Sequence, residues 1–146
     1  MIDATDQVTR NKATLAWLNS ALNGGDLHLI SAAIDEAFEP DVQIGTPLPS
    51  GASGAEALKQ VWAALLRAYP DLHVAVEDLV AEGDTIASRH TVTGTHLGEH
   101  LGVAPTGRPV TYSEMFFVRF DHGRITHTWG VVDILAQLKQ LGAFPG

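Results

Sequence analysis

The chain has 146 residues, and its 17 Asp and Glu side chains against nine Lys and Arg give a formal net charge of −8. This balance argues against nucleic acid and anionic membrane surfaces as partners, because both need clusters of basic side chains. The absence of cysteine excludes disulfides, thiolate nucleophiles and Cys-ligated zinc. The length is typical of one domain, no apolar run reaches the ~18 residues of a membrane span, and the N-terminus is acidic. We therefore expect one cytoplasmic domain over residues 1–146.

Three helices are predicted in the N-terminal half, where apolar side chains recur at helical spacing. Asp26 is a suitable N-cap for the second helix. Ser53 and Glu56 have the spacing of a capping box at the start of the third. The helices are expected at residues 6–22, 27–37 and 53–68, with a short strand at 42–46 between the second and the third.

After residue 71 the hydrophobic period changes from 3.6 to 2, which predicts strands. Turn signals at residues 82–84 and 121–123 separate them. Helices followed by a meander of strands predict an α+β fold, with the N-terminal helices packed on the concave face of a strongly bent, cone-shaped antiparallel sheet. The strands are expected from residue 72 to the first turn, at 85–95, 111–120 and 124–132, before a short helix at 134–141.

The concave face of such a sheet would line a pocket for a small apolar or aromatic ligand. Period 2 places Tyr112, Glu114 and Phe116 on one face of their strand, and His90 on the more apolar face of its own. Tryptophan side chains could line the same pocket, although aromatic residues are first of all core material. The candidate ligand-binding residues are His90, Tyr112, Phe116, Trp129 and Trp62.

Glu114 is the first candidate for catalysis, because it lies among aromatic residues without a basic neighbour in the sequence. Burial in apolar surroundings raises the pKa of a carboxyl group, which can then act as a general acid or base near neutral pH. The alternative is that Glu114 points outward or pairs with Arg89 or Arg108 across the sheet.

His127 and Asp133 are the other catalytic candidates, on the last predicted strand and just after it. A histidine on the cavity face can shuttle protons, and a carboxylate can orient it or act alone. The alternatives are a partly exposed strand residue for His127 and an N-cap of the last helix for Asp133.

The remaining histidines do not predict a metal centre. His96 and His100 have the spacing of a helical metal pair, but the glycines around them indicate a loop, and no third ligand is near in the sequence. Three others are expected at the surface, namely His28, His73 and His122.

The opposite face of the strand at 111–120 suggests how copies of the chain associate. Met115, Phe117 and Arg119 would form an exposed apolar patch there, and large patches of this kind usually mark interfaces. We therefore expect a homodimer through the outer face of the sheet.

Several segments, in order along nearly the whole chain, resemble the SnoaL-like polyketide cyclases. This family belongs to the nuclear-transport-factor-2-like superfamily, so the resemblance implies a cystatin-like α+β barrel related to ketosteroid isomerase and limonene epoxide hydrolase. The segments are AYPDL (68–72), VEDLVAEGD (76–84), GTHLGE (94–99), GVAPTGR (102–108), DHGRI (121–125) and QLKQLG (137–142).

The resemblance also implies an activity. Such cyclases close a ring by an intramolecular aldol reaction without cofactor or metal, using an acidic residue as general acid and base. Glu114 is the nearest match to that residue, and Asp133 is the second. Many relatives carry aspartate where Phe116 stands and an acidic residue where His127 stands. The expected function is thus proton transfer on a flat polycyclic or aromatic carbonyl compound. The alternatives are a non-catalytic binding protein and, less favoured, an epoxide or lactone hydrolase.

Overall fold

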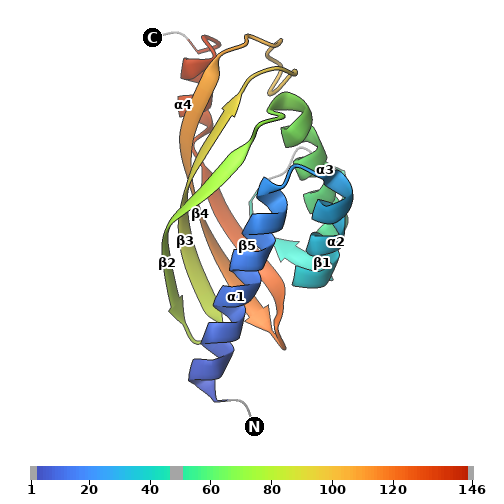
Figure 1. Ribbon diagram of the computed structural model, residues 1–146, viewed down its shortest axis with the longest axis vertical. Helices are drawn as coiled ribbons and strands as arrows, with labels where there is room; N and C mark the ends of the chain where they lie inside the picture. Colours follow the sequence, from blue (N-terminus) through green and yellow to red (C-terminus); the bar gives the residue numbers. More distant parts are fainter. Residues whose placement is uncertain (1–2, 47–50, 145–146) are drawn as a thin grey trace.

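The fold is known from a computed structural model that describes residues 3–46 and 51–144. Figure 1 shows helices α1, α2 and α3 on one side of a curled sheet, with α4 at its upper end. This arrangement confirms the predicted α+β class. The elements in chain order are α1 (Ala4–Asn23), α2 (Leu27–Ala37), β1 (Phe38–Ile44), α3 (Gly54–Ala68), β2 (His73–Glu82), β3 (Thr85–Thr95), β4 (Pro109–Asp121), β5 (Arg124–Val132) and α4 (Ile134–Gln140).

The five strands lie in the order β1-β5-β4-β3-β2. Strands β2 to β5 are antiparallel to their neighbours, as predicted, but β1 runs parallel to β5. The expectation of a purely antiparallel sheet is therefore wrong for this edge strand. A hairpin forces two strands to be antiparallel, whereas β1 reaches β5 only after the rest of the chain has intervened, so no turn fixes its direction.

The start of α3 differs from the predicted capping box. Ser53 is the N-cap residue, but its side chain makes no capping hydrogen bond. The next residue, Gly54, has a φ of 64°. A Cβ there would collide with the carbonyl oxygen of Pro40. Glycine thus lets the start of α3 approach the edge strand β1, and this contact shapes the helix start in place of the serine cap.

The strands β4 and β5 are irregular near the turn that joins them. Phe120 pairs with Ile125, and the preceding residue of β4, Arg119, pairs with His127. Thr126 is therefore one extra residue on β5, a β-bulge. Ile125 points inward and is fully buried, whereas beyond the bulge the inward positions are Thr128, Gly130 and Val132, each paired with an inward residue of β4.

The interior between helices and sheet contains two apolar clusters rather than one. The first joins α1 and α2 to the β4–β5 turn end of the sheet, and the second joins the end of α3 to α4 and the start of β2. Trp62 and Leu66 of α3 pack against both. Between the clusters, the inward positions of β3 and β4 carry Ser88, His90 and Glu114. The apolar core is therefore interrupted by polar side chains in the middle of the sheet.

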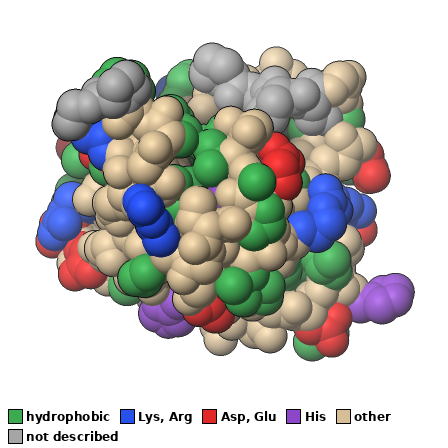
Figure 2. Space-filling model, turned by 90° about the horizontal axis from the view of Figure 1, so that it is seen from above, with side chains coloured by type: hydrophobic (Ala, Val, Ile, Leu, Met, Phe, Trp, Pro, Cys, Tyr) green, Lys and Arg blue, Asp and Glu red, His purple; other side chains and the backbone are tan. Residues whose placement is uncertain are grey.

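The surface is mixed in character. Seen from the end that carries α4, charged side chains stand mainly around the rim and apolar side chains are exposed between them (Figure 2). Within the described ranges, no helix is long and apolar enough to cross a bilayer.

Candidate active site

The polar interruption of the core is centred on a pair of side chains from neighbouring strands. His90 of β3 lies directly opposite Glu114 of β4, and Nδ1 of the histidine is 3.0 Å from Oε1 of the glutamate. Both side chains are only 16% exposed. An ionised carboxylate can only accept hydrogen bonds, so Nδ1 donates and Nε2 is left with its lone pair. The carboxylate of Glu114 thus sets the tautomer of the His90 imidazole, and Nε2 is the nitrogen that can accept a proton.

The imidazole of His90 is held in place by an aromatic ring. Phe116 stacks with it at a centroid distance of 5.9 Å and an interplanar angle of 27°. Gly130 lies opposite Phe116 on β5, and a Cβ at this glycine would collide with the phenyl ring. The absence of a side chain at position 130 therefore makes room for Phe116.

Two further predicted pocket residues lie inside. Tyr112 is buried one inward position before Glu114. Burial, followed by the charge of Glu114 and the neighbouring Tyr69, raises the pKa of the Tyr112 phenol, which therefore stays protonated and can donate a hydrogen bond. Trp62 is half-buried on α3 and packs against both clusters, so it belongs to the helical side of the interior. The prediction of an inward-facing set is confirmed for His90, Tyr112, Glu114 and Phe116.

The structure excludes the alternative partners considered for Glu114. Arg89 points to the outer face, where its Nε donates to Oδ2 of Asp78 at 2.8 Å. Arg108 donates from Nη1 to the carbonyl oxygen of Gln140 at 3.2 Å. Neither guanidinium contacts Glu114, whose only hydrogen-bonding side chain among the described residues is His90.

His127 and Trp129 were predicted on the cavity face, and this prediction is wrong. They pair with the outward residues Arg119 and Phe117 of β4. On the outer face the His127 and Trp129 rings stack at 5.6 Å and 11°, and the Arg119 guanidinium lies 5.3 Å from the Trp129 ring. The bulge at Thr126 and the space that Phe116 requires at position 130 together turn this set outward.

Asp133 acts as the N-cap of α4. Its Oδ1 accepts a hydrogen bond from the backbone N–H of Ala136 at 2.9 Å, and the residue is exposed. Of the two roles considered, the structure supports the cap, because the carboxylate is turned to the helix end. Asp133 and His127 therefore do not join Glu114 in one site.

Sequence reasoning missed a second polar cluster, beneath the loop that joins β3 to β4. His96 is fully buried, and its Nδ1 accepts from the backbone N–H of Thr106 at 3.2 Å. The ring of His100 lies 5.3 Å from that of Tyr69, and burial lowers the pKa of His100. A clue was present in Gly94, whose missing side chain admits the Tyr69 ring. The described residues contain no group of three or more His, Cys, Asp or Glu side chains that could hold a metal ion.

Comparison with known proteins identifies the family of the chain. The family model of the SnoaL-like polyketide cyclases matches residues 12–141. The chain belongs to this family. Among curated proteins, none matches it significantly.

Solved structures extend the likeness over almost the whole chain. AclR from Streptomyces galilaeus, for which a hydroxylase activity has been suggested, is 32% identical with a TM-score of 0.81, over 95% of this chain and 85% of its own. IdmH from Streptomyces antibioticus, a suggested polyketide cyclase, is 34% identical with a TM-score of 0.76, over 90% of this chain and 98% of its own. A SnoaL-like protein from Jannaschia sp. CCS1 shares the fold, at 24% identity and a TM-score of 0.85, over 99% and 100% of the two chains.

Proposed function

We propose that this SnoaL-like protein is a cofactor-independent acid–base enzyme that acts on a flat aromatic or polycyclic carbonyl compound. The observation that carries the proposal is the largely buried His90–Glu114 pair, 3.0 Å between Nδ1 and Oε1, between the two apolar clusters of the core. A hydrogen-bonded histidine–carboxylate pair in apolar surroundings suits proton transfer at neutral pH. The membership of the family supports a reaction of the aldol type.

In this reaction His90 removes a proton from the carbon next to a carbonyl group. The C–H bond breaks, Nε2 of His90 takes the proton, and the electron pair forms an enolate. Glu114 accepts the Nδ1–H hydrogen bond throughout and stabilises the imidazolium by its charge. The enolate carbon then attacks a second carbonyl of the same molecule, a C–C bond forms, and the new alkoxide takes the proton back from Nε2. Atoms and charge balance without a further reactant.

The neighbouring aromatic side chains would hold the substrate. Phe116 and Trp62 offer apolar faces to a flat ring system, which suits offset stacking of aromatic groups. Tyr112, as a neutral phenol, is suited to donate a hydrogen bond to the carbonyl oxygen as negative charge develops there. This division assigns the base to His90 and its orientation to Glu114, which refines the expectation that Glu114 is itself the base.

The test uses proton exchange, which needs no knowledge of the natural substrate. Tetralones, indanones and anthrones are incubated with the protein in D2O, and loss of the signal of the acidic C–H protons is followed by NMR. Wild type should accelerate exchange in at least one enolisable ketone. His90→Gln and Glu114→Gln should each slow it about 10²–10⁴-fold, the usual contribution of a positioned acid–base group.

Two matched controls separate the pair from general effects of charge. His73→Gln and Glu77→Gln make the same chemical changes at exposed positions of β2 and should exchange like wild type. If Glu114→Gln and His90→Gln also keep full activity, the assignment is wrong. If aromatic ligands bind tightly and no ketone exchanges, the protein is a carrier and the acid–base reaction is refuted.

A further inference from the structure

A groove on the helical side of the molecule lies apart from the His90–Glu114 pair. It runs between α1 and the end of α2, above the turn that joins β4 to β5, and has a volume of about 400 Å³. Sites for small ligands usually measure roughly 300–1,000 Å³. The lining residues are Ala13, Thr14, Trp17, Glu36, Ala37 and Gly123.

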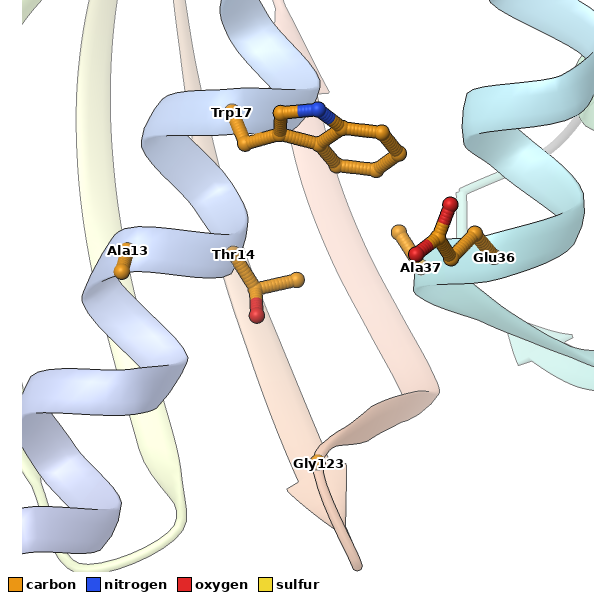
Figure 3. Close-up of a pocket in the computed structure, with 6 residues that line it drawn as sticks. All are labelled: Ala13, Thr14, Trp17, Glu36, Ala37 and Gly123. Carbon is orange, nitrogen blue, oxygen red and sulfur yellow. The ribbon is translucent and has the colours of Figure 1, made fainter.

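Three of the lining residues are small and leave room between the side chains of Trp17 and Glu36. Ala13 and Ala37 contribute a methyl group each from the two helices, and Gly123 contributes only backbone. Trp17 lies one turn after Ala13 on α1 and is 45% exposed, which is unusual for so large an apolar ring. Figure 3 shows its indole on one side of the groove and the carboxylate of Glu36 on the other.

Glu36 is the charged residue of the groove. Two acidic residues near Glu36 in the sequence are paired with cations: Asp35 with Lys59 at 2.8 Å and Glu39 with Arg124 at 3.2 Å. Glu36 has no ion pair or hydrogen bond from its carboxylate to any described residue. It stands at the C-terminal end of α2, where the Arg124 guanidinium donates to the carbonyl oxygens of Asp35 and Phe38 and offsets the negative end of the helix dipole. The charge of the groove is therefore that of the Glu36 carboxylate itself. No Lys or Arg lines the groove.

An aromatic face opposite a free carboxylate recognises one kind of ligand particularly well. A quaternary or protonated ammonium group is attracted to the π face of tryptophan, the strongest partner for cation–π contacts, and to the negative charge of a carboxylate. The hydroxyl of Thr14 donates to the carbonyl oxygen of Arg10 at 3.1 Å and keeps lone pairs that can accept a hydrogen bond from an ammonium N–H. The net charge of −8 favours approach of a cation.

We propose that this groove binds a small organic ammonium compound, with the cationic head over the indole of Trp17 and Glu36 as its counter-charge. The site shares no residue with the His90–Glu114 pair and does not depend on the catalytic proposal.

Choline and its uncharged isostere 3,3-dimethylbutan-1-ol form a matched pair of probes. Each is titrated into the protein while the indole N–H signal of Trp17, identified by its loss in Trp17→Phe, is followed by NMR. Choline should shift this signal and bind at least about tenfold more tightly than the alcohol. Glu36→Gln should weaken choline binding about fivefold, as expected for exposed ionic and cation–π contacts.

The control variant is Glu56→Gln, which removes the same charge from an exposed helical position of α3. It should bind choline like wild type. Equal affinity for choline and the neutral alcohol would overturn the proposal, as would a Glu36→Gln variant that binds choline as tightly as wild type. Both affinity comparisons use wild type or a conservative surface change, and Trp17→Phe serves only to identify the indole signal.

Discussion

The sheet stacks a histidine on an aromatic ring twice, once on each face. Inside, His90 stacks with Phe116, and outside, His127 stacks with Trp129. The inner histidine contacts a carboxylate, Glu114, and is largely buried, whereas the outer stack lies under the guanidinium of Arg119 at the surface. The comparison shows that a histidine beside an aromatic ring is not by itself a catalytic signature. Its charged partner and its exposure decide what it can do.

The outer stack belongs to an extensive apolar surface. Met115 and Phe117 are each 55% exposed, and Val131 is 75% exposed. The outward set of β5 is thus more apolar than its inward set, which is the reverse of what a solvated sheet face requires. We infer that a second copy of the chain covers this face, because a self-complementary patch around a two-fold axis would bury both sets of rings.

The largest effect on stability is expected when the buried His90–Glu114 pair is broken. His90→Leu leaves the carboxylate of Glu114 buried without a partner and should lower the free energy of unfolding by about 2–4 kcal/mol. The double variant His90→Leu/Glu114→Leu should recover most of this loss, because the two apolar clusters could then join into one core. Urea denaturation of the single and double variants measures the difference. Additive losses would contradict this view of an interrupted core.

A second contrast compares one glycine behind each stack. Gly130→Ala would drive a methyl group into Phe116 beneath the inner histidine, and should cost about 2 kcal/mol, as overpacking does. Gly45→Ala would meet Trp129 on the outer face, where the half-exposed indole can shift, and should cost about 1 kcal/mol or less. Thermal or urea unfolding of both variants decides the order, and a larger loss for Gly45→Ala would reverse the assignment of faces.

Acid should act on the interior through His100. Burial lowers its pKa below the ordinary value of 6.5, so the folded state binds this proton less readily than the unfolded state. Its stabilising contribution is therefore complete above pH 6.5 and is lost as the pH falls below that value. His100→Gln should flatten the dependence of unfolding free energy on pH between 6.5 and 5, with the exposed substitution His73→Gln as the control for loss of an imidazole. An unchanged slope in His100→Gln would contradict the prediction.

The smallest effect on the stability of the folded monomer is expected for a substitution on the outer face of the sheet. Phe117→Lys places a charge on an exposed position and should change the stability of the monomer by no more than about 0.5 kcal/mol. The same change should abolish the dimer that we infer. Sedimentation velocity at micromolar concentration tests this directly, with Glu77→Lys at an exposed position of β2 as the control. A wild-type chain that sediments only as a monomer would refute the dimer.

Sequence reasoning located the elements well because the periodicity is local information. The bounds of α2, β3 and β5 agree with those expected from spacing and turn residues. The inward set on β4 was also predictable, since Tyr112, Phe116 and Val118 make one face clearly more apolar than the other. The pairing of His90 with Glu114 depends on the register between β3 and β4, and the hydrophobic pattern of each strand by itself does not give that register.

The side of β5 could not be predicted from the sequence for a physical reason. His127, Trp129 and Val131 do share a face, as their spacing indicated, but the more apolar set points outward. Hydrophobic patterning identifies the inner face only when the outer face is in water. The apolar outward set of β5 breaks that assumption, as it would if the dimer that we infer covered this face.

The bulge at Thr126 gives this fold a particular evolutionary sensitivity. Because it adds one residue to β5 just after the turn, every later side chain of the strand owes its side to that single position. If Thr126 were instead paired in a regular strand, the residues after it would exchange faces, so that Gly130 would leave the crowded place beside Phe116 and the outer rings would turn inward; deleting Thr126 would remove the bulge and leave each later side chain opposite its present partner on β4. A substitution on β5 therefore changes one face of the sheet at a time, whereas a residue inserted beyond the bulge would exchange the inward and outward sets that follow it in one event.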